Sequence, residues 1–212
     1  MDGLLIDTEP YWQATERKVF MDLGIEITEK MQVETFGLRS DEQIRHWYNL
    51  RPWKTMSLDA VESRYNEVML DYFQKEAELM EGAEHALDFF FTKGIPLALA
   101  SSSNMQLINA FLDRFGFHRY FQEVYSAEFE EFGKPHPAVY LETARRMNTD
   151  PVSCLALEDS FHGLIAAKAA RMTTIAVPAH RDARYNASDM VLDSLTQITD
   201  EVFSHLNQLQ QS

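Results

Sequence analysis

Short apolar runs alternate with helical patterns from about residue 81 to the C-terminus, and this alternation constrains the fold more than any other feature. The run Ile95-Pro-Leu-Ala-Leu-Ala100 has the length and continuous hydrophobicity of a strand that is covered on both faces. Strands are expected at 95–100, 123–126, 154–157, 174–177 and 191–192, and helices near 86–91, at 104–115, 137–147 and 163–172, and in a C-terminal segment containing Leu206. The order predicts βαβ units and a parallel sheet, which is an α/β fold.

The segment before this alternation has little strand pattern and is predicted to be helical. Thr8 is placed to cap a helix over 9–23, and Ser40-Asp-Glu-Gln43 has the spacing of a capping box at the start of another. A long helix is expected over 57–78, where apolar residues form one stripe. We therefore expect a compact helical subdomain at 9–80 and an α/β core made of 1–8 and 81–212.

The charge and composition exclude several classes of function. A formal net charge of −14 makes a nucleic-acid partner improbable, because binding to phosphate backbones depends on clustered basic groups. The chain contains one cysteine, Cys154, so an intramolecular disulfide is excluded and a reducing compartment fits. No apolar run approaches the ~20 residues of a membrane span, and no signal peptide is evident. The expectation is a cytoplasmic protein without a membrane partner, and a monomer.

Polar residues follow two of the expected strands directly, where ligands bind in parallel α/β sheets. Ser101, Ser102 and Ser103 come after one strand, and Lys134 lies in the loop beyond the next. Hydroxyls and the N–H groups of a helix start can bind phosphate oxygens, and a lysine adds a compact positive charge. These residues predict a phosphate site that includes Ser101, Ser102 and Lys134.

Two adjacent carboxylates, Glu158 and Asp159, end another expected strand. Their mutual repulsion is costly unless a cation relieves it, and Mg²⁺ with oxygen ligands is the usual partner beside phosphate. Each signal also has a purely structural interpretation: a serine turn can be a helix cap, a lysine a surface residue, and Glu158-Asp159-Ser160 the first turn of a helix. Their order, and their common place at strand ends, favour one joint site.

Four stretches together resemble the haloacid dehalogenase-like phosphatases, in the subgroup with a helical cap inserted near the N-terminus. The stretches are 2–10, 97–101, 133–137 and 157–160 with Gly163. Within that subgroup the chain is similar to hexitol and 2-deoxyglucose-6-phosphate phosphatases and to β-phosphoglucomutases. The resemblance implies a Rossmann-like core with a parallel sheet, an inserted α-helical cap, Mg²⁺ as cofactor and a small phosphorylated metabolite as substrate.

The resemblance also implies residue roles. Asp2 matches the general acid and base of the family, whose backbone carbonyl helps to bind Mg²⁺. Ser101 matches the phosphate-binding hydroxyl, Lys134 the lysine that holds nucleophile and phosphate together, and Glu158 and Asp159 the metal-binding acids. In the cap, Arg39 resembles an arginine that meets the far end of the substrate, although a plain surface arginine is the alternative. Glu9 lies near the hinge between core and cap and could line the cleft.

The first motif departs from the family pattern, which should be Asp-x-Asp-Gly. Here x is Met1 and the second acid is Asp2, so the nucleophilic aspartate and its apolar strand would lie just upstream of Met1. Loss of this central strand would leave a slot lined by unpaired backbone groups, each costing about 1–3 kcal/mol. We therefore expect that the natural protein extends upstream and that the chain from Met1 onward turns over little substrate.

Three hypotheses for function follow from the residues and the resemblance. The first is a Mg²⁺-dependent phosphatase acting on small sugar phosphates through an aspartyl-phosphate. The second is a sugar-phosphate mutase with the same core, which must hold a second phosphate; the cap loop offers Arg39 but lacks the Ser-Arg order expected of the mutases. The third is a non-catalytic module that binds sugar phosphates. Dehalogenase chemistry has no use for a metal-binding acid pair.

Overall fold

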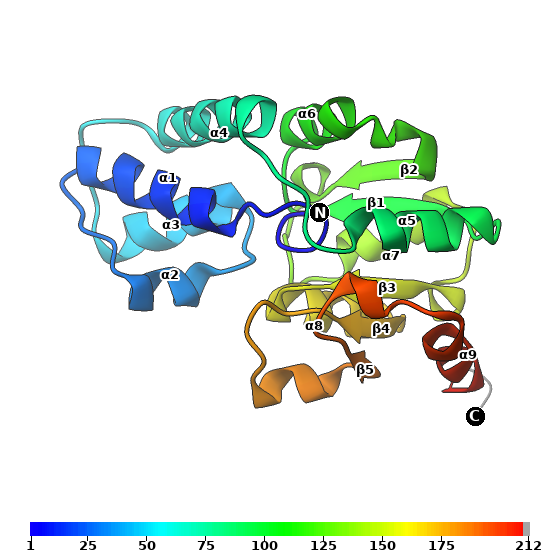
Figure 1. Cartoon of the computed structure of the whole chain (residues 1–212). Helices are drawn as coiled ribbons and strands as arrows, with labels where there is room; N and C mark the ends of the chain where they lie inside the picture. Colours follow the sequence, from blue (N-terminus) through cyan, green and yellow to red (C-terminus); the bar gives the residue numbers. More distant parts are fainter. Residues whose placement is uncertain (210–212) are drawn as a thin grey trace.

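The computed structural model describes the backbone of residues 1–209 and the side chains of residues 1–206. It separates into a helical region and an α/β region, joined by two chain segments that run side by side (Figure 1). The α-helices are α1 (Glu9–Asp22), α2 (Glu29–Thr35), α3 (Ser40–Leu50), α4 (Leu58–Lys75), α5 (Ala83–Thr92), α6 (Met105–Phe115), α7 (Ala138–Arg146), α8 (Phe161–Ala169) and α9 (Asp200–Leu209). The strands are β1 (Leu97–Ser101), β2 (Phe121–Ser126), β3 (Leu155–Glu158), β4 (Thr173–Ala176) and β5 (Met190–Val191).

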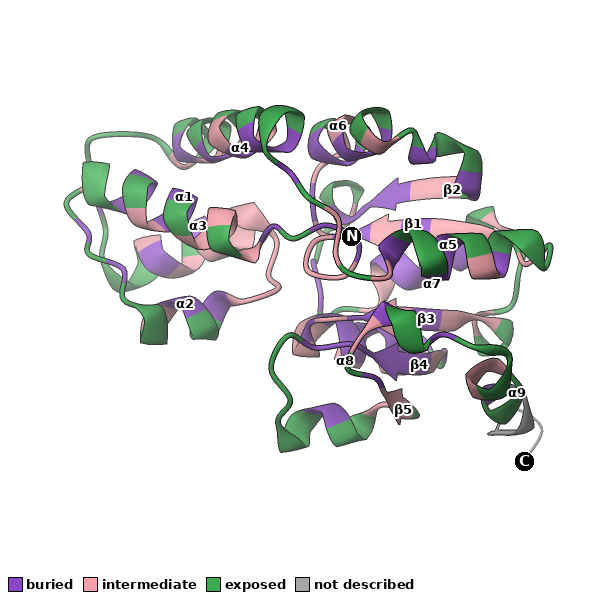
Figure 2. Cartoon of the chain, viewed as in Figure 1, coloured by how far each residue is buried: buried purple, intermediate pink, exposed green. Residues whose placement is uncertain are grey.

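All strand pairs in the α/β region are parallel, as the alternation of strands and helices predicts. β1 pairs with β2, and β3 pairs with β4, which pairs with β5. Figure 2 shows β4 buried, with the outward turns of the surrounding helices exposed. The five strands and the helices between them lie within a few residues of their predicted positions, so the α/β prediction is confirmed.

The described strands form two separate hydrogen-bonded groups, not one continuous sheet. β1 and β3 line opposite sides of a mainly apolar slot with a volume of about 350 Å³, which Leu4 and Leu5 also line. Within the described residues, β1 has β2 as its strand partner and β3 has β4. One backbone edge of β1 and one of β3 are therefore without a strand partner, which matches the slot expected from the first motif.

The helical region has a core of its own and shares one helix with the α/β region. Phe20, Trp47 and Tyr65 are fully buried at its centre. Farther along α4, Met69 and Phe73 are buried in the main core of the α/β region instead. Because α4 contributes to both cores, it connects the two regions as one continuous helix. The boundary at residue 80 remains a prediction.

Two chain segments cross between the regions and are hydrogen-bonded to each other. Ile6 pairs with Leu79 in an antiparallel bridge, and the N–H of Asp7 donates to the carbonyl of Glu78 at 3.0 Å. The N–H of Met80 donates to the carbonyl of Leu5 at 3.0 Å. These bonds fix the N-terminal loop at the edge of the slot.

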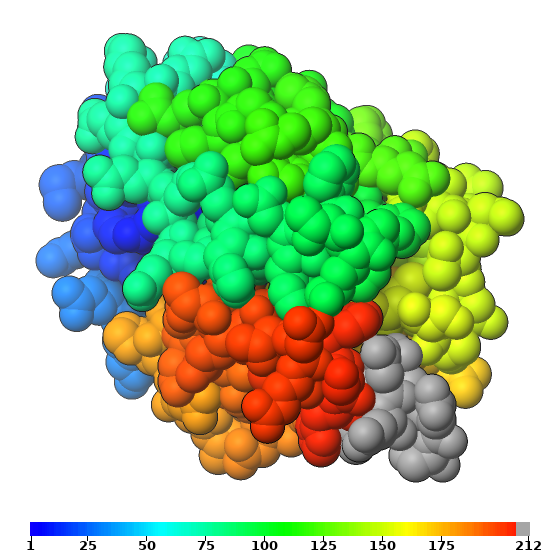
Figure 3. Space-filling view, turned by 45° about the vertical axis from the view of Figure 1, so that its right-hand side comes forward, coloured from blue at the N-terminus to red at the C-terminus, as the bar shows by residue number. Residues whose placement is uncertain are grey.

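The C-terminal helix α9 packs against α5. Figure 3 shows this segment in red against the green segment that contains α5. The ring of Phe203 lies 6.2 Å from that of Phe89 and 5.9 Å from that of Phe90. Among the described residues, no helix is long and apolar enough to cross a membrane.

Two predicted helix starts are wrong in detail. Thr8 stands at the N-terminus of α1, but its side chain makes no capping hydrogen bond and its hydroxyl is buried without a partner among the described residues. Ser40 is the first residue of α3, so Ser40 to Gln43 do not form a capping box. The amide of Gln43 instead bonds to Glu16 and Thr35 in the interior, where these partners compete successfully with the helix end.

Candidate active site

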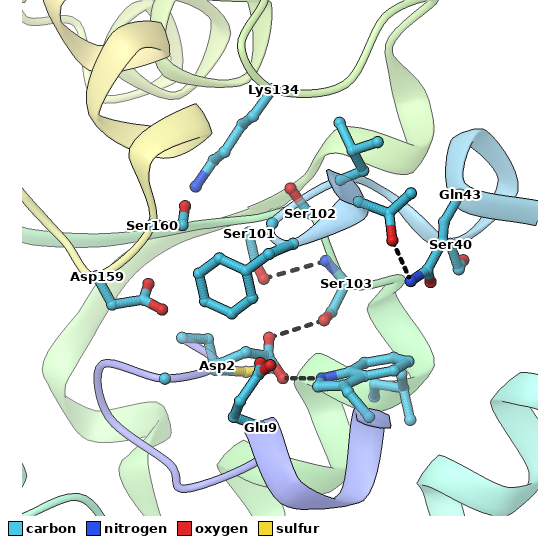
Figure 4. Close-up of a pocket in the computed structure, with 18 of the residues that line it drawn as sticks. Asp2, Glu9, Ser40, Gln43, Ser101, Ser102, Ser103, Lys134, Asp159 and Ser160 are labelled. Carbon is cyan, nitrogen blue, oxygen red and sulfur yellow. Dashed lines mark hydrogen bonds between the residues drawn. The ribbon is translucent and has the colours of Figure 1, made fainter. Parts of the chain in front are cut away.

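A cleft of about 120 Å³ lies between the helical region and the carboxyl ends of β1 and β3. Figure 4 shows that its core side is formed by the N-terminal loop, the serine turn after β1 and the start of α8. Its opposite side is formed by residues of α1, α2, α3 and α4. The cleft therefore lies at the carboxyl ends of the parallel strands, where ligands were expected to bind.

Asp2 is held by one residue from each side of the cleft. The indole N–H of Trp12 on α1 donates to Oδ1 at 3.2 Å, and the hydroxyl of Ser103 donates to Oδ2 at 2.8 Å. With both oxygens engaged, the carboxylate has a defined orientation. Such an orientation suits a group that transfers a proton at a fixed position.

The turn after β1 carries the predicted phosphate hydroxyls. The backbone N–H of Ser103 donates to Oγ of Ser101 at 3.1 Å, and the hydroxyl of Ser126 donates to the carbonyl of Ser103 at 2.7 Å. The hydroxyl of Ser102 is buried and has no hydrogen-bond partner among the described residues. An orphaned buried hydroxyl facing a cleft is a ready donor to an anionic oxygen.

Lys134 is buried against the end of β3. Its Nζ lies 2.5 Å from Oε1 of Glu158 and 3.3 Å from the hydroxyl of Tyr140. Tyr140 also donates to Glu158. Burial raises the pKa of Glu158, but the ion pair with Lys134 and the hydrogen bond from Tyr140 outweigh it, so the pKa lies below its ordinary value. Glu158 is thus a carboxylate that anchors the lysine.

Asp159 has no such partner. Among the described residues its carboxylate has no ion-pair partner, and burial followed by repulsion from Glu158 raises its pKa to about 7. A Cβ added to Gly3 would lie 2.1 Å from Oδ2 of Asp159, and Gly3 also has φ +63°. Glycine is therefore required beside this carboxylate for both space and backbone conformation.

The donor set fits a hard cation. The carboxylates of Glu158 and Asp159 and the nearby backbone of Asp2 offer oxygen, which Mg²⁺ prefers. Burial and repulsion from Glu158 raise the pKa of Asp159, and a cation at this place would relieve both. Asp2 is expected to contribute its backbone carbonyl, since its side chain is engaged by Trp12 and Ser103. Within the described part of the chain, no group of three His, Cys, Asp or Glu side chains converges on one point. A cation here would therefore rely on backbone or ligand oxygens as well.

The side of the cleft formed by the helical region is rich in amides and carboxylates. Glu16 is buried and accepts hydrogen bonds from Gln32, Gln43 and Trp47 at 2.7 to 2.9 Å. Burial raises the pKa of Glu16 although these donors oppose it. Asn66 also lines the cleft, with Oδ1 buried and unpartnered in the described part of the chain.

The two predicted cap residues have different environments. Glu9 lines the cleft and accepts a 2.8 Å hydrogen bond from Gln13, and burial raises its pKa. Arg39 does not line it: its Nη1 donates to the carbonyls of Ala127 and Glu130 at 2.6 and 2.8 Å, and Asp41 pairs with the same guanidinium. Arg39 therefore joins the helical region to the α/β region in this structure.

The structure brings most of the predicted site together. Asp2, Glu9, Ser101, Ser102, Lys134, Glu158 and Asp159 all line the cleft, and Arg39 lies outside it. Sequence reasoning missed Tyr140, Glu16, Gln43 and Asn66. Gln43 matched the pattern of a capping box, and the other three lie on helices, where the spacing of apolar residues draws attention away from single polar ones.

Comparisons with known proteins agree with this geometry. A family model described as haloacid dehalogenase-like hydrolase matches residues 1–177. The chain is 38% identical over 203 residues to hexitol phosphatase B of Escherichia coli (strain K12), covering 94% of this chain and 91% of that protein. CbbY from Rhodobacter sphaeroides in complex with phosphate aligns with a TM-score of 0.85 at 23% identity, covering 93% of each chain. A β-phosphoglucomutase from Clostridium difficile aligns with a TM-score of 0.84 at 24% identity, covering 98% of this chain and 95% of that one. The two solved structures show a shared fold.

Proposed function

Because the chain belongs to the haloacid dehalogenase-like hydrolases, we propose that it is a Mg²⁺-dependent phosphatase of small sugar phosphates that works through an aspartyl-phosphate. One observation carries this proposal: an orphaned hydroxyl, a buried lysine, an oriented aspartate and a carboxylate without an ion-pair partner among the described residues line one cleft. Similarity to hexitol phosphatase B, and to a phosphorylated carbohydrates phosphatase of Thermotoga maritima at 31% identity, supports a sugar-phosphate substrate.

Each residue has a role in this proposal. Ser101, Ser102 and Lys134 bind the phosphoryl oxygens, with Glu158 fixing the lysine. Mg²⁺, held by the Asp2 carbonyl and the carboxylates of Glu158 and Asp159, would neutralise negative charge at the phosphoryl group. Asp2 donates a proton to the leaving oxygen and later accepts one from water, and its orientation by Trp12 and Ser103 serves both steps.

We place the phosphoryl acceptor, an aspartate, on backbone that immediately precedes Met1. The slot between β1 and β3 supports this placement, because its two parallel walls leave one edge each without a strand partner. Met1 lines both the slot and the cleft. A parallel strand of about five or six residues could hydrogen bond to both walls and end beside the phosphate groups.

A matched pair of extended chains tests this placement. Each chain is extended before Met1 by about five apolar residues and then one further residue directly before Met1. This last residue is Asp in one chain and Asn in the other. The Asp chain is expected to release phosphate from sorbitol 6-phosphate with Mg²⁺, whereas the Asn chain, which cannot form the acyl phosphate, is expected to release almost none. Equal release from both chains would show that the acceptor lies elsewhere.

A sugar-phosphate mutase is the alternative that the same core could serve. It would have to hold a second phosphate, and Arg39, the cap cation offered for that purpose, is bonded to Ala127, Glu130 and Asp41. A protein that binds sugar phosphates without turnover is the other alternative. Phosphate release from a panel of sugar phosphates, with and without Mg²⁺, separates the three. Steady Mg²⁺-dependent release supports the phosphatase, isomerisation with slow release the mutase, and binding alone the non-catalytic protein.

A further inference from the structure

The cleft has an uneven distribution of charge. Among the described residues that line the cleft, Lys134 at the core side supplies a positively charged side chain, and it is already paired with Glu158. The opposite side carries the carboxylates of Glu9 and Glu16, and no Lys, Arg or His side chain of the described residues lines it. Arg17 donates to Gln32 but does not line the cleft. The part of a substrate that lies far from the phosphate site therefore meets acceptors and negative charge.

Hydrogen bonds within the helical region fix which atoms face that part of the substrate. The amide nitrogen of Gln43 donates to Oε1 of Glu16 at 2.9 Å and to Oγ1 of Thr35 at 3.0 Å. Both amide hydrogens are thereby engaged, so the carbonyl oxygen of Gln43 is the group left for a ligand. Figure 4 shows Gln43 at the border of the cleft, with one of the two hydrogen bonds that its nitrogen donates.

Asn66 supplies a second acceptor of the same kind. It comes from α4, and its Oδ1 is buried with no hydrogen-bond partner among the described residues. A buried carbonyl oxygen without a partner costs free energy, which a hydroxyl donor from a ligand would recover. Glu16 positions this side of the cleft, since it accepts from Gln32, Gln43 and Trp47 and so connects α1, α2 and α3.

We propose that Asn66 and Gln43 determine specificity by accepting hydrogen bonds from the hydroxyls of an uncharged polyol or sugar leaving group. Glu16 is the positioning residue for Gln43. The acidic surroundings disfavour a second phosphate, so the preferred substrate carries one phosphate and several hydroxyls. This inference rests on the proposed phosphatase function, and it adds the residues that distinguish a monophosphate from a bisphosphate.

Equilibrium binding with Mg²⁺ tests the inference. Titration calorimetry in an Asp2→Asn background, which removes the proposed proton donor, prevents consumption of the ligand. The probes are inorganic phosphate, sorbitol 6-phosphate and fructose 1,6-bisphosphate. Loss of one neutral hydrogen bond corresponds to about 2- to 10-fold in affinity. Asn66→Ala and Gln43→Ala are each expected to lower the affinity for sorbitol 6-phosphate by about that factor. The affinity for inorganic phosphate should not change.

Matched variants separate recognition from folding. Asn49→Ala on α3 removes an exposed asparagine of the same region and is expected to change neither affinity. Asn66→Asp keeps the hydrogen-bond acceptor, so the affinity for sorbitol 6-phosphate should be retained. The added negative charge should weaken the binding of fructose 1,6-bisphosphate further. Asn66→Lys should raise the affinity for fructose 1,6-bisphosphate by about 10-fold or more, because a positive charge then lies near the second phosphate.

Three results would overturn the inference. The first is that Asn66→Ala lowers the affinities for inorganic phosphate and sorbitol 6-phosphate equally, and the second is that it changes neither affinity. The third is that fructose 1,6-bisphosphate binds the protein with an unchanged helical region as tightly as sorbitol 6-phosphate does. Absence of binding by all three probes would overturn the proposed function, and this inference with it. Binding of phosphate with the expected loss on Asn66→Ala supports both.

Discussion

Trp12 donates its indole N–H to the carboxylate of Asp2 at 3.2 Å, and this bond joins the helical region to the proposed acid and base of the α/β region. Ser103 holds the other oxygen from the core side. The carboxylate of Asp2 therefore has both of these hydrogen bonds only when α1 is in the place that the structure shows. The position of the helical region and the orientation of the Asp2 carboxylate are therefore linked through the hydrogen bond from Trp12.

Replacing Trp12 by Phe should remove the bond and keep most of the ring. We expect kcat in a catalytically competent extended chain to fall by about 2- to 10-fold, the worth of one hydrogen bond, with KM little changed. Trp53→Phe is the matched control, since Trp53 is buried in the helical region and donates to Met56, away from the cleft. A phosphate-release assay measures both, and an equal loss in the two variants would contradict a specific role for Trp12.

Gly3→Ala should disturb Asp159 more than the backbone alone would. The new methyl group would lie 2.1 Å from Oδ2 of Asp159. Gly24→Ala is the control, because Gly24 has φ +78° but nothing within 4 Å of an added Cβ. Both variants should lose about 1 kcal/mol of stability through backbone strain, but only Gly3→Ala should weaken the thermal stabilisation produced by Mg²⁺. The same Mg²⁺ response in both variants would argue against Asp159 as a ligand.

Lys134 and Glu158 form a buried pair, with side-chain exposures of 7% and 5%. Lys134→Met should destabilise the protein by about 3–5 kcal/mol, because it leaves a buried carboxylate without its cation. Adding Glu158→Gln should recover part of that loss, since the remaining group is then neutral. Urea unfolding of the two single variants and the double variant gives the coupling free energy, and simple additivity would contradict the pairing.

Glu16 should make stability depend on pH. Burial raises its pKa in the folded chain above the ordinary value of 4.5, so the folded state holds the proton more tightly than the unfolded state does. Its contribution is complete below pH 4.5 and is lost as the pH rises through the folded pKa. The free energy of unfolding of the unchanged chain minus that of Glu16→Gln should therefore fall as the pH rises from 4.5 through the folded pKa of Glu16. Urea unfolding at a series of pH values measures this difference, and a flat or rising curve would contradict the assignment.

The order of strands and helices and the core side of the cleft follow from short-range patterns. Ser101, Lys134 and Glu158 could be placed together because strand ends in a parallel sheet converge on one edge. Asn104, which caps α6 by accepting from the N–H of Leu107, shows the same local logic. These features depend on contacts that the chain order already determines.

The opposite side of the cleft depends on packing between helices, and beyond Glu9 the sequence patterns did not place it. Ser40 to Gln43 match a capping box, but Glu16 and Thr35 offer the amide of Gln43 better partners. Asn66 lies between buried and exposed residues of one helix, so its orphaned oxygen is visible only once α4 is packed. Arg39 had a role by resemblance, and carbonyls of a distant loop engage it instead.

The antiparallel bridge between Ile6 and Leu79 has a mechanical consequence. The two crossing segments are laced into a narrow ribbon, with further bonds from Asp7 to Glu78 and from Met80 to Leu5. These hydrogen bonds resist sliding of one crossing segment along the other, whereas the paired segments can still bend together. Because α4 is packed in both cores, we expect any swing of the helical region about that pivot to shift Met69 and Phe73 against the α/β core and to separate Trp12 from Asp2 in the same movement.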